Sequence, residues 1–108
     1  MYFKKQPGEF DIVLIDCITL LVSNLLGSDT DGPDMDTRVQ DEITQIVDRA
    51  HVMDKTFIIV SNEVGTGLVP ANELGRLYRD LLGKANQLLA QNADEVYLMV
   101  AGIPMKVK

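Results

Sequence analysis

The sequence contains very little cysteine and histidine: Cys17 and His51 are the only residues of their types. One cysteine cannot form a disulfide within the chain, which excludes the class of small secreted domains that depend on several disulfides. The first eight residues also lack the apolar run of a secretory signal. We therefore expect a protein of the reducing cytoplasm.

Positive charge is scarce, and no apolar run is long. Ten Lys and Arg residues against sixteen Asp and Glu give a formal net charge of -6. Proteins that bind nucleic acids rely on clustered cations, so long polyanions are not expected partners. The longest apolar stretch, 12–26, is interrupted by polar residues and is shorter than the ~20 apolar residues of a membrane-spanning helix. No membrane span is expected.

The composition that remains is typical of a soluble globular domain. Hydrophobic residues make up 46% and charged residues 24% of the 108 residues. This length is common for one domain, and neither an internal repeat nor a low-complexity segment is present. We predict a single α/β domain over residues 1–108.

Three apolar segments predict strands. Residues 11–15 form a short continuous apolar run after Asp11, which is typical of a strand buried on both faces of a parallel sheet. Residues 56–60 are β-branched and aromatic and predict a second buried strand. Residues 95–101 form the third predicted strand. After a turn at Gly102 and Pro104, residues 104–108 form a possible short edge strand.

Three segments with helical spacing separate or follow these strands. Residues 17–26 are apolar on nearly all sides, residues 36–53 are amphipathic, and residues 71–91 carry a long stripe of leucines. Strands that alternate with helices predict an α/β fold with a mainly parallel sheet and flanking helices.

Asp16 follows the first predicted strand directly. Nucleotide enzymes with a P-loop use a carboxylate in this position to hold Mg²⁺ beside the phosphates. A carboxylate there can equally cap the helix that begins at Cys17, because it accepts hydrogen bonds from free backbone N–H groups. The two roles can coexist.

Several segments together carry a family resemblance. They are 14–26, with the sequence LIDCITLLVSNLL, 60–70, with VSNEVGTGLVP, and then Arg76, 78–80, Gly83, 86–87 and 93–96. Their order and the Asn-Glu-Val-Gly-x-Gly-x-Val-Pro pattern at 62–70 resemble the bifunctional adenosylcobinamide kinase/adenosylcobinamide-phosphate guanylyltransferase family of cobalamin biosynthesis. The resemblance extends from about residue 11 to residue 108.

The resemblance implies a P-loop NTPase (RecA-like) fold and two reactions. These enzymes phosphorylate a hydroxyl of adenosylcobinamide and then transfer GMP from GTP to that phosphate through a guanylylated histidine. Both steps use Mg²⁺, with GTP or ATP as the nucleotide, and family members form homotrimers. Asp16 matches the acidic position that contacts nucleotide or metal, and Thr19 and Asn24 match the same motif.

The chain also departs from the family pattern. The phosphate-cradling motif Gly-x-x-x-x-Gly-Lys-Ser does not occur in these 108 residues. His51 lies downstream of the acidic strand, whereas the nucleophilic histidine of the family lies upstream, and a cation near a helix C-terminus needs only the helix dipole to explain it. We therefore expect a fold that lacks its N-terminal P-loop portion, with no catalytic residue present and no activity alone.

Further candidates lie in the loop after the second strand and in the last helix. Asn62 and Glu63 can orient the corrinoid or the guanine, or hold the loop by local hydrogen bonds. The remaining candidates are Gly65, Gly67, Arg76 and Arg79. The glycines permit a positive φ or a close backbone approach, which a structural turn also explains. The arginines suit phosphate charge, although an exposed Arg–Asp pair is the alternative.

Three interpretations stay open. The chain is a split or truncated enzyme whose exposed strand edges bind a separate P-loop-containing fragment or another copy. Alternatively, it is a non-catalytic corrinoid-binding or interaction module derived from the family. In the third interpretation it is part of a longer gene product, against which Met1 argues. We expect an oligomer.

Overall fold

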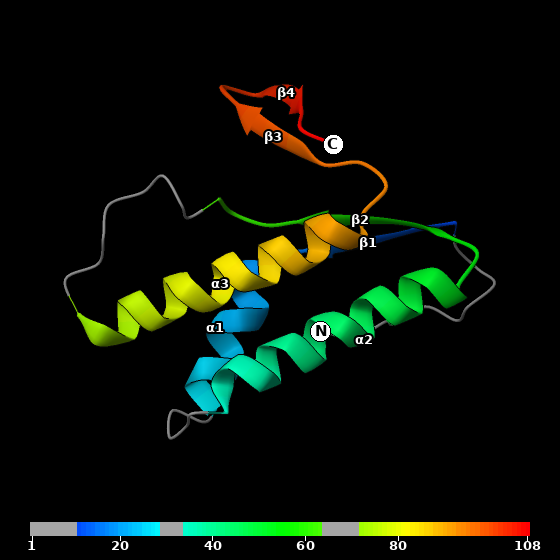
Figure 1. The fold of residues 1–108 in the computed structure, drawn as a ribbon. Helices are drawn as coiled ribbons and strands as arrows, with labels where there is room; N and C mark the ends of the chain where they lie inside the picture. The colour runs from blue at the N-terminus through cyan, green and yellow to red at the C-terminus, as the bar shows by residue number, and fades with distance from the viewer. Residues whose placement is uncertain (1–10, 29–33, 64–71) are drawn as a thin grey trace.

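The computed structural model describes residues 11–28, 34–63 and 72–108. Its elements run along the chain in the order β1 (Ile12–Asp16), α1 (Ile18–Ser28), α2 (Met35–Val52), β2 (Thr56–Val60), α3 (Glu73–Asn92), β3 (Tyr97–Val100) and β4 (Ile103–Lys106) (Figure 1). The α/β class is confirmed. The strands form two separate two-stranded sheets, a parallel pair β1–β2 and an antiparallel pair β3–β4.

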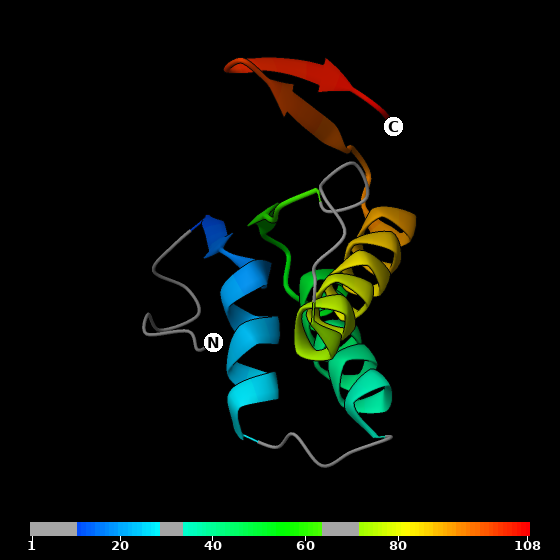
Figure 2. The same cartoon turned by 90° about the vertical axis from the view of Figure 1, so that its left-hand side faces the viewer.

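The β1–β2 sheet has its three helices on one side (Figure 2). Val13 and Ile15 of β1 face these helices and are buried, whereas Ile12 and Leu14 are 58% and 61% exposed. The prediction that this strand is buried on both faces is therefore wrong for the described residues. A continuous apolar run allows both faces of a strand to be buried, but burial of the second face also needs another element that packs against it.

Strand β2 repeats this one-sided burial. Phe57 and Ile59 are half-buried against the core, and Ile58 and Val60 on the other face are 47% and 41% exposed. The register pairs Leu14 with Ile58, so aliphatic side chains of both strands share the open face.

The core lies between the sheet and the helices. Its most buried side chains come from every helix, since Ile18 and Val22 of α1, Ile43 of α2 and Leu82 of α3 are all 0% exposed. Each such side chain contributes about 1.5–3 kcal/mol when it leaves water. The predicted apolar faces of α2 and α3 are therefore confirmed in their central turns. Helix α1, which was predicted to be apolar on nearly all sides, buries only one side and leaves Leu20 58% exposed.

The third predicted strand differs from the expectation. It does not join the parallel sheet but pairs antiparallel with β4, so that Val100 lies opposite Ile103. Ala101 and Gly102 both have positive φ, 52° and 76°, as in the tight turn that suits a two-residue hairpin loop. The predicted turn and short final strand are confirmed, but a hairpin replaces the third parallel strand.

The end of the chain attaches this hairpin to α3. Lys108 Nζ donates hydrogen bonds to the carbonyl oxygens of Ala90 at 2.9 Å and Gln91 at 3.1 Å. Carbonyl groups in the last turn of a helix lack partners within the helix, and a lysine there also suits the helix dipole. At the other end of α3, Asn72 Oδ1 accepts a hydrogen bond from the Gly75 N–H at 2.6 Å and caps the helix.

No helix within the described ranges is long and apolar enough to cross a membrane.

Candidate functional site at the carboxyl ends of the parallel strands

The parallel register of β1 and β2 creates a common edge where both strands end. Asp16, the last residue of β1, lies opposite Val60, the last residue of β2. The segments that follow, Cys17 into α1 and 61–63 after β2, therefore leave the sheet side by side. Such an edge is where open α/β sheets commonly bind ligands.

Asp16 presents an exposed carboxylate at this edge. No group of three or more His, Cys, Asp and Glu side chains that could hold a metal gathers among the residues that the structure describes. Mg²⁺ is commonly held by one or two carboxylates, with phosphate oxygens and water completing its six ligands. With fewer than three such side chains gathered there among the described residues, Asp16 fits a metal that arrives with a nucleotide better than a metal held by protein alone.

The first turn of α1 is tied to α3. Tyr78 Oη donates a hydrogen bond to the carbonyl oxygen of Thr19 at 3.3 Å. Burial of the Tyr78 ring raises the pKa of its hydroxyl above the usual 10.0, and the nearby Cys17 adds to this effect. Thr19 Oγ1 is itself buried and has no hydrogen-bond partner within the described part of the chain.

The segment after β2 is also tied to α3. Ser61 Oγ donates a hydrogen bond to Asn86 Oδ1 at 2.5 Å, and Asn86 Nδ2 donates one to the carbonyl oxygen of Asn62 at 2.8 Å. Ser61 and Asn86 are half-buried, whereas Asn62 and Glu63 are exposed. The candidate pair Asn62–Glu63 therefore follows β2 at the edge where Asp16 ends β1, and Asn86 of α3 holds its backbone.

The other candidate residues from the sequence are not all placed at this edge. Arg76 and Arg79 lie on α3 on either side of Tyr78 in sequence, and Arg76 is the more exposed of the two. Gly65 and Gly67 lie outside the described residues. His51 is exposed in the last turn of α2, and the chain continues from there to the amino end of β2 at Thr56. It therefore approaches the sheet at the end opposite Asp16.

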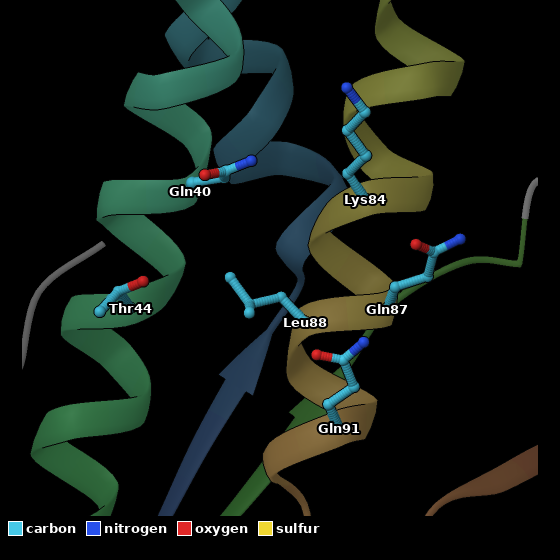
Figure 3. Close-up of a pocket in the computed structure, with 6 residues that line it drawn as sticks. All are labelled: Gln40, Thr44, Lys84, Gln87, Leu88 and Gln91. Atoms are coloured by element: carbon cyan, nitrogen blue, oxygen red, sulfur yellow. The ribbon is translucent and has the colours of Figure 1, made fainter.

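A shallow groove of about 290 Å³ lies elsewhere, between α2 and α3. Figure 3 shows that the parallel strands run behind the two helices and that polar side chains border the groove. Its lining residues are Gln40, Thr44, Lys84, Gln87, Leu88 and Gln91. None of them belongs to the common edge, so this groove and the candidate site are separate features.

Comparison with known proteins identifies the relatives of the chain. The family model described as cobinamide kinase / cobinamide phosphate guanyltransferase matches residues 2–107. The chain belongs to this family. Its members are bifunctional enzymes of cobalamin biosynthesis, as the resemblance of the 62–70 pattern implied.

Three bifunctional adenosylcobalamin biosynthesis proteins of the cobinamide kinase family are similar to this chain. The protein CobU of Salmonella typhimurium is 41% identical over an alignment of 106 positions, which covers 91% of this chain and 59% of that protein. CobU of Escherichia coli is 39% identical over 95% of this chain and 60% of its own length. CobP of Pseudomonas aeruginosa is 36% identical over 89% and 53%. The chain thus spans slightly more than half the length of these relatives.

Sequence analysis did not identify the side chains that fix the two segments following β1 and β2 in this member of the cobinamide kinase family. Ser61, Tyr78 and Asn86 were noted within the family pattern, but none was assigned a role. One signal was available for Asn86, because asparagine is a poor helix former and here stands in the middle of α3 beside the buried Ala85. A polar residue in such a place often has a specific partner.

Proposed function

We propose that this chain provides the acidic strand end and the adjoining loop of an enzyme that phosphorylates adenosylcobinamide and transfers GMP from GTP to the product. The observation that carries the proposal is the common edge of the parallel strands, where Asp16 ends β1 opposite Val60 and the exposed Asn62 and Glu63 follow β2. Membership of the cobinamide kinase family supports the substrate class.

In this proposal Asp16 contacts the Mg²⁺ that accompanies GTP or ATP, directly or through water. A carboxylate at the end of an apolar strand suits this role because it adds negative charge opposite the metal without needing further protein ligands. Asn62 and Glu63 contact the corrinoid or the guanine, and Arg76 and Arg79 stabilise phosphate charge. Gly65 and Gly67 belong to the same proposed loop.

The segment that cradles the phosphates comes from residues other than these 108, because the sequence contains no Gly-x-x-x-x-Gly-Lys-Ser motif. The histidine that accepts GMP also comes from elsewhere, because His51 lies toward the amino end of β2, away from Asp16. We infer that a P-loop-containing segment joins the chain at its open strand edges, and that copies of the chain assemble further. Without that segment the 108 residues bind nucleotide weakly and do not catalyse either reaction.

The proposal is tested by calorimetry of Mg²⁺-GTP binding to the chain with and without a P-loop-containing N-terminal segment of the Salmonella relative. We expect strong binding only in the mixture and about 10- to 100-fold weaker binding with Asp16→Ala, since hydrogen bonds to charged groups contribute about 1.5–3 kcal/mol. Asp11→Ala is the matched control, because Asp11 precedes the amino end of β1 and its side chain is 3.8 Å from Lys55.

Each other outcome has a definite meaning. Equal affinities of the Asp16→Ala mixture and the unmodified mixture would remove Asp16 from the site. If the folded chain binds no nucleotide in any mixture but binds cobinamide specifically, the alternative function is correct, and the chain is a non-catalytic corrinoid-binding or interaction module of this family.

A further inference from the structure

Asn86 connects two consecutive residues of the strand-end segment to a helix that is distant in sequence. Its Oδ1 accepts from Ser61 Oγ at 2.5 Å, and its Nδ2 donates to the Asn62 carbonyl oxygen at 2.8 Å. The carbonyl of Asn62 can only accept, so it determines which end of the Asn86 amide faces it. Both halves of one amide are therefore used on adjacent residues.

The position of Asn86 on α3 makes this connection rigid. Its helical neighbours Leu82 and Ala85 are 0% and 2% exposed, so the core holds this part of α3. The segment 61–63 lies beyond the last paired residue, Val60, and the β1–β2 ladder no longer holds its backbone. The amide of Asn86 therefore fixes the position of residues 61 and 62, which lie just beyond the last paired residue of the sheet.

The segment that Asn86 holds is the one that carries Asn62 and Glu63 past Asp16. The pairing of Asp16 with Val60 brings Ser61 to the edge immediately after the strand. A side chain that fixes Ser61 and Asn62 therefore also sets where Asn62 and Glu63 point relative to the Asp16 carboxylate. Sites with oriented groups depend on such supporting hydrogen bonds.

We propose that Asn86 is a positioning residue of the candidate site, which holds the Ser61–Glu63 segment in the orientation that ligand binding beside Asp16 requires. This inference rests on the proposed function, because the orientation of Asn62 and Glu63 matters only if the edge binds a ligand. Asn86 itself does not touch the ligand. It acts through the backbone of Asn62 and the hydroxyl of Ser61.

Three variants separate its two hydrogen bonds. Asn86→Ala removes both. Asn86→Asp keeps the acceptor for Ser61 and replaces the donor to Asn62, whereas Ser61→Ala keeps the donor to Asn62. The matched control is Asn92→Ala, because Asn92 lies on the same helix and its Nδ2 donates to Leu88 within that helix at 2.8 Å. Both Asn→Ala changes on α3 improve helix propensity, so a difference between them reflects the tertiary hydrogen bonds of Asn86 and not the stability of the helix itself.

The first measurement is amide hydrogen exchange of the chain alone. We expect exchange at residues 61–63 to be about tenfold faster in Asn86→Ala than in the unmodified chain, with the amides around Leu82 unchanged and with Asn92→Ala without effect at 61–63. Unchanged exchange at 61–63 in Asn86→Ala would overturn the proposal, whatever the chain binds.

The second measurement is Mg²⁺-GTP affinity in the mixture with the P-loop-containing segment, at a temperature where every variant is fully folded. We expect about tenfold weaker binding for Asn86→Ala and at least as large a loss for Asn86→Asp, because its carboxylate would face the Asn62 carbonyl oxygen. We expect an intermediate loss for Ser61→Ala and no loss for Asn92→Ala. Faster exchange at 61–63 with unchanged affinity would show that Asn86 supports only the fold. If the unmodified mixture binds no GTP, the proposed nucleotide function fails, and a positioning role at this site fails with it.

Discussion

At the scale of single residues, the candidate site depends on side chains that the sequence pattern presents as ordinary helix positions. Tyr78 and Asn86 are both on α3, and they hold the two segments that leave the parallel strands, at Thr19 and at 61–62. Asp16 was predicted from the sequence because a carboxylate after an apolar strand is a local pattern. Tyr78 and Asn86 were not assigned roles because their partners are 59 and 24–25 residues away.

The Tyr78 hydroxyl makes a testable contribution to stability. Tyr78→Phe removes the hydrogen bond to the Thr19 carbonyl and should lower the free energy of unfolding by about 0.5–1.5 kcal/mol at neutral pH, as measured by urea unfolding. Tyr97→Phe is the control, because the Tyr97 hydroxyl donates to the exposed side chain of Glu95, only two residues away in sequence. If both variants lose the same amount, the contact with Thr19 is not what stabilises α3.

The same residue predicts a dependence on alkaline pH. Burial raises the pKa of Tyr78 in the folded chain above the unfolded value of 10.0. Above that pH the unfolded chain loses the proton first, so stability from this group is present below about pH 10 and is lost as the pH rises further. The difference in free energy of unfolding between the unmodified chain and Tyr78→Phe should therefore shrink between about pH 8 and about pH 10.5. A difference in free energy of unfolding that does not change with pH would contradict this prediction.

At the scale of elements, the helices were predicted best. The leucine stripe of α3 is a local pattern, and the structure buries its middle, Leu81 and Leu82, at 2% and 0% exposure. Its first turns differ, since Leu74 and Leu77 are 57% and 38% exposed. Helical spacing shows which face is apolar, but it does not show how much of the length a neighbour covers.

This difference along α3 gives a matched pair of variants. Leu82→Ala should lower the free energy of unfolding by about 2–5 kcal/mol, because it leaves a cavity in the core between α1, α2 and α3. Leu74→Ala should cost less than about 1 kcal/mol, because the side chain is already 57% exposed. Thermal or urea unfolding of the two variants measures both values, and similar losses would show that the start of α3 is covered in solution.

At the scale of the whole molecule, the main feature is apolar surface that no described residue covers. The open face of β1–β2 carries Ile12, Leu14 and Ile58. On one face of the β3–β4 hairpin, paired positions are all apolar, with exposures between 40% and 65%: Leu98, Val100, Ile103 and Met105. A two-stranded hairpin without a covered face is marginally stable in water, so this surface suits an interface.

We therefore expect the chain to self-associate through the hairpin. The double variant Leu98→Glu/Met105→Lys removes one apolar pair and keeps the cross-strand pairing through opposite charges. It should shift the mass measured by light scattering toward 12.0 kDa, the mass of one chain. Val52→Lys is the control, because Val52 is an isolated apolar residue at the end of α2 with 84% exposure. A monomeric unmodified chain at high concentration would contradict the expectation.

The sequence by itself determined the helices, the positions of the strands, the acidic strand end and the family, because each of these depends on residues that are close together in the chain. Only the tertiary structure decided that β3 pairs with β4 rather than with the parallel sheet, that one face of β1–β2 stays open, and that Asn86 meets Ser61 and Asn62. Strand partners and layer cover depend on which distant segments can bury apolar surface against each other. An apolar run has the same sequence pattern whether its second face is covered or bare, and for that reason the pattern of 11–15 could not predict the open face.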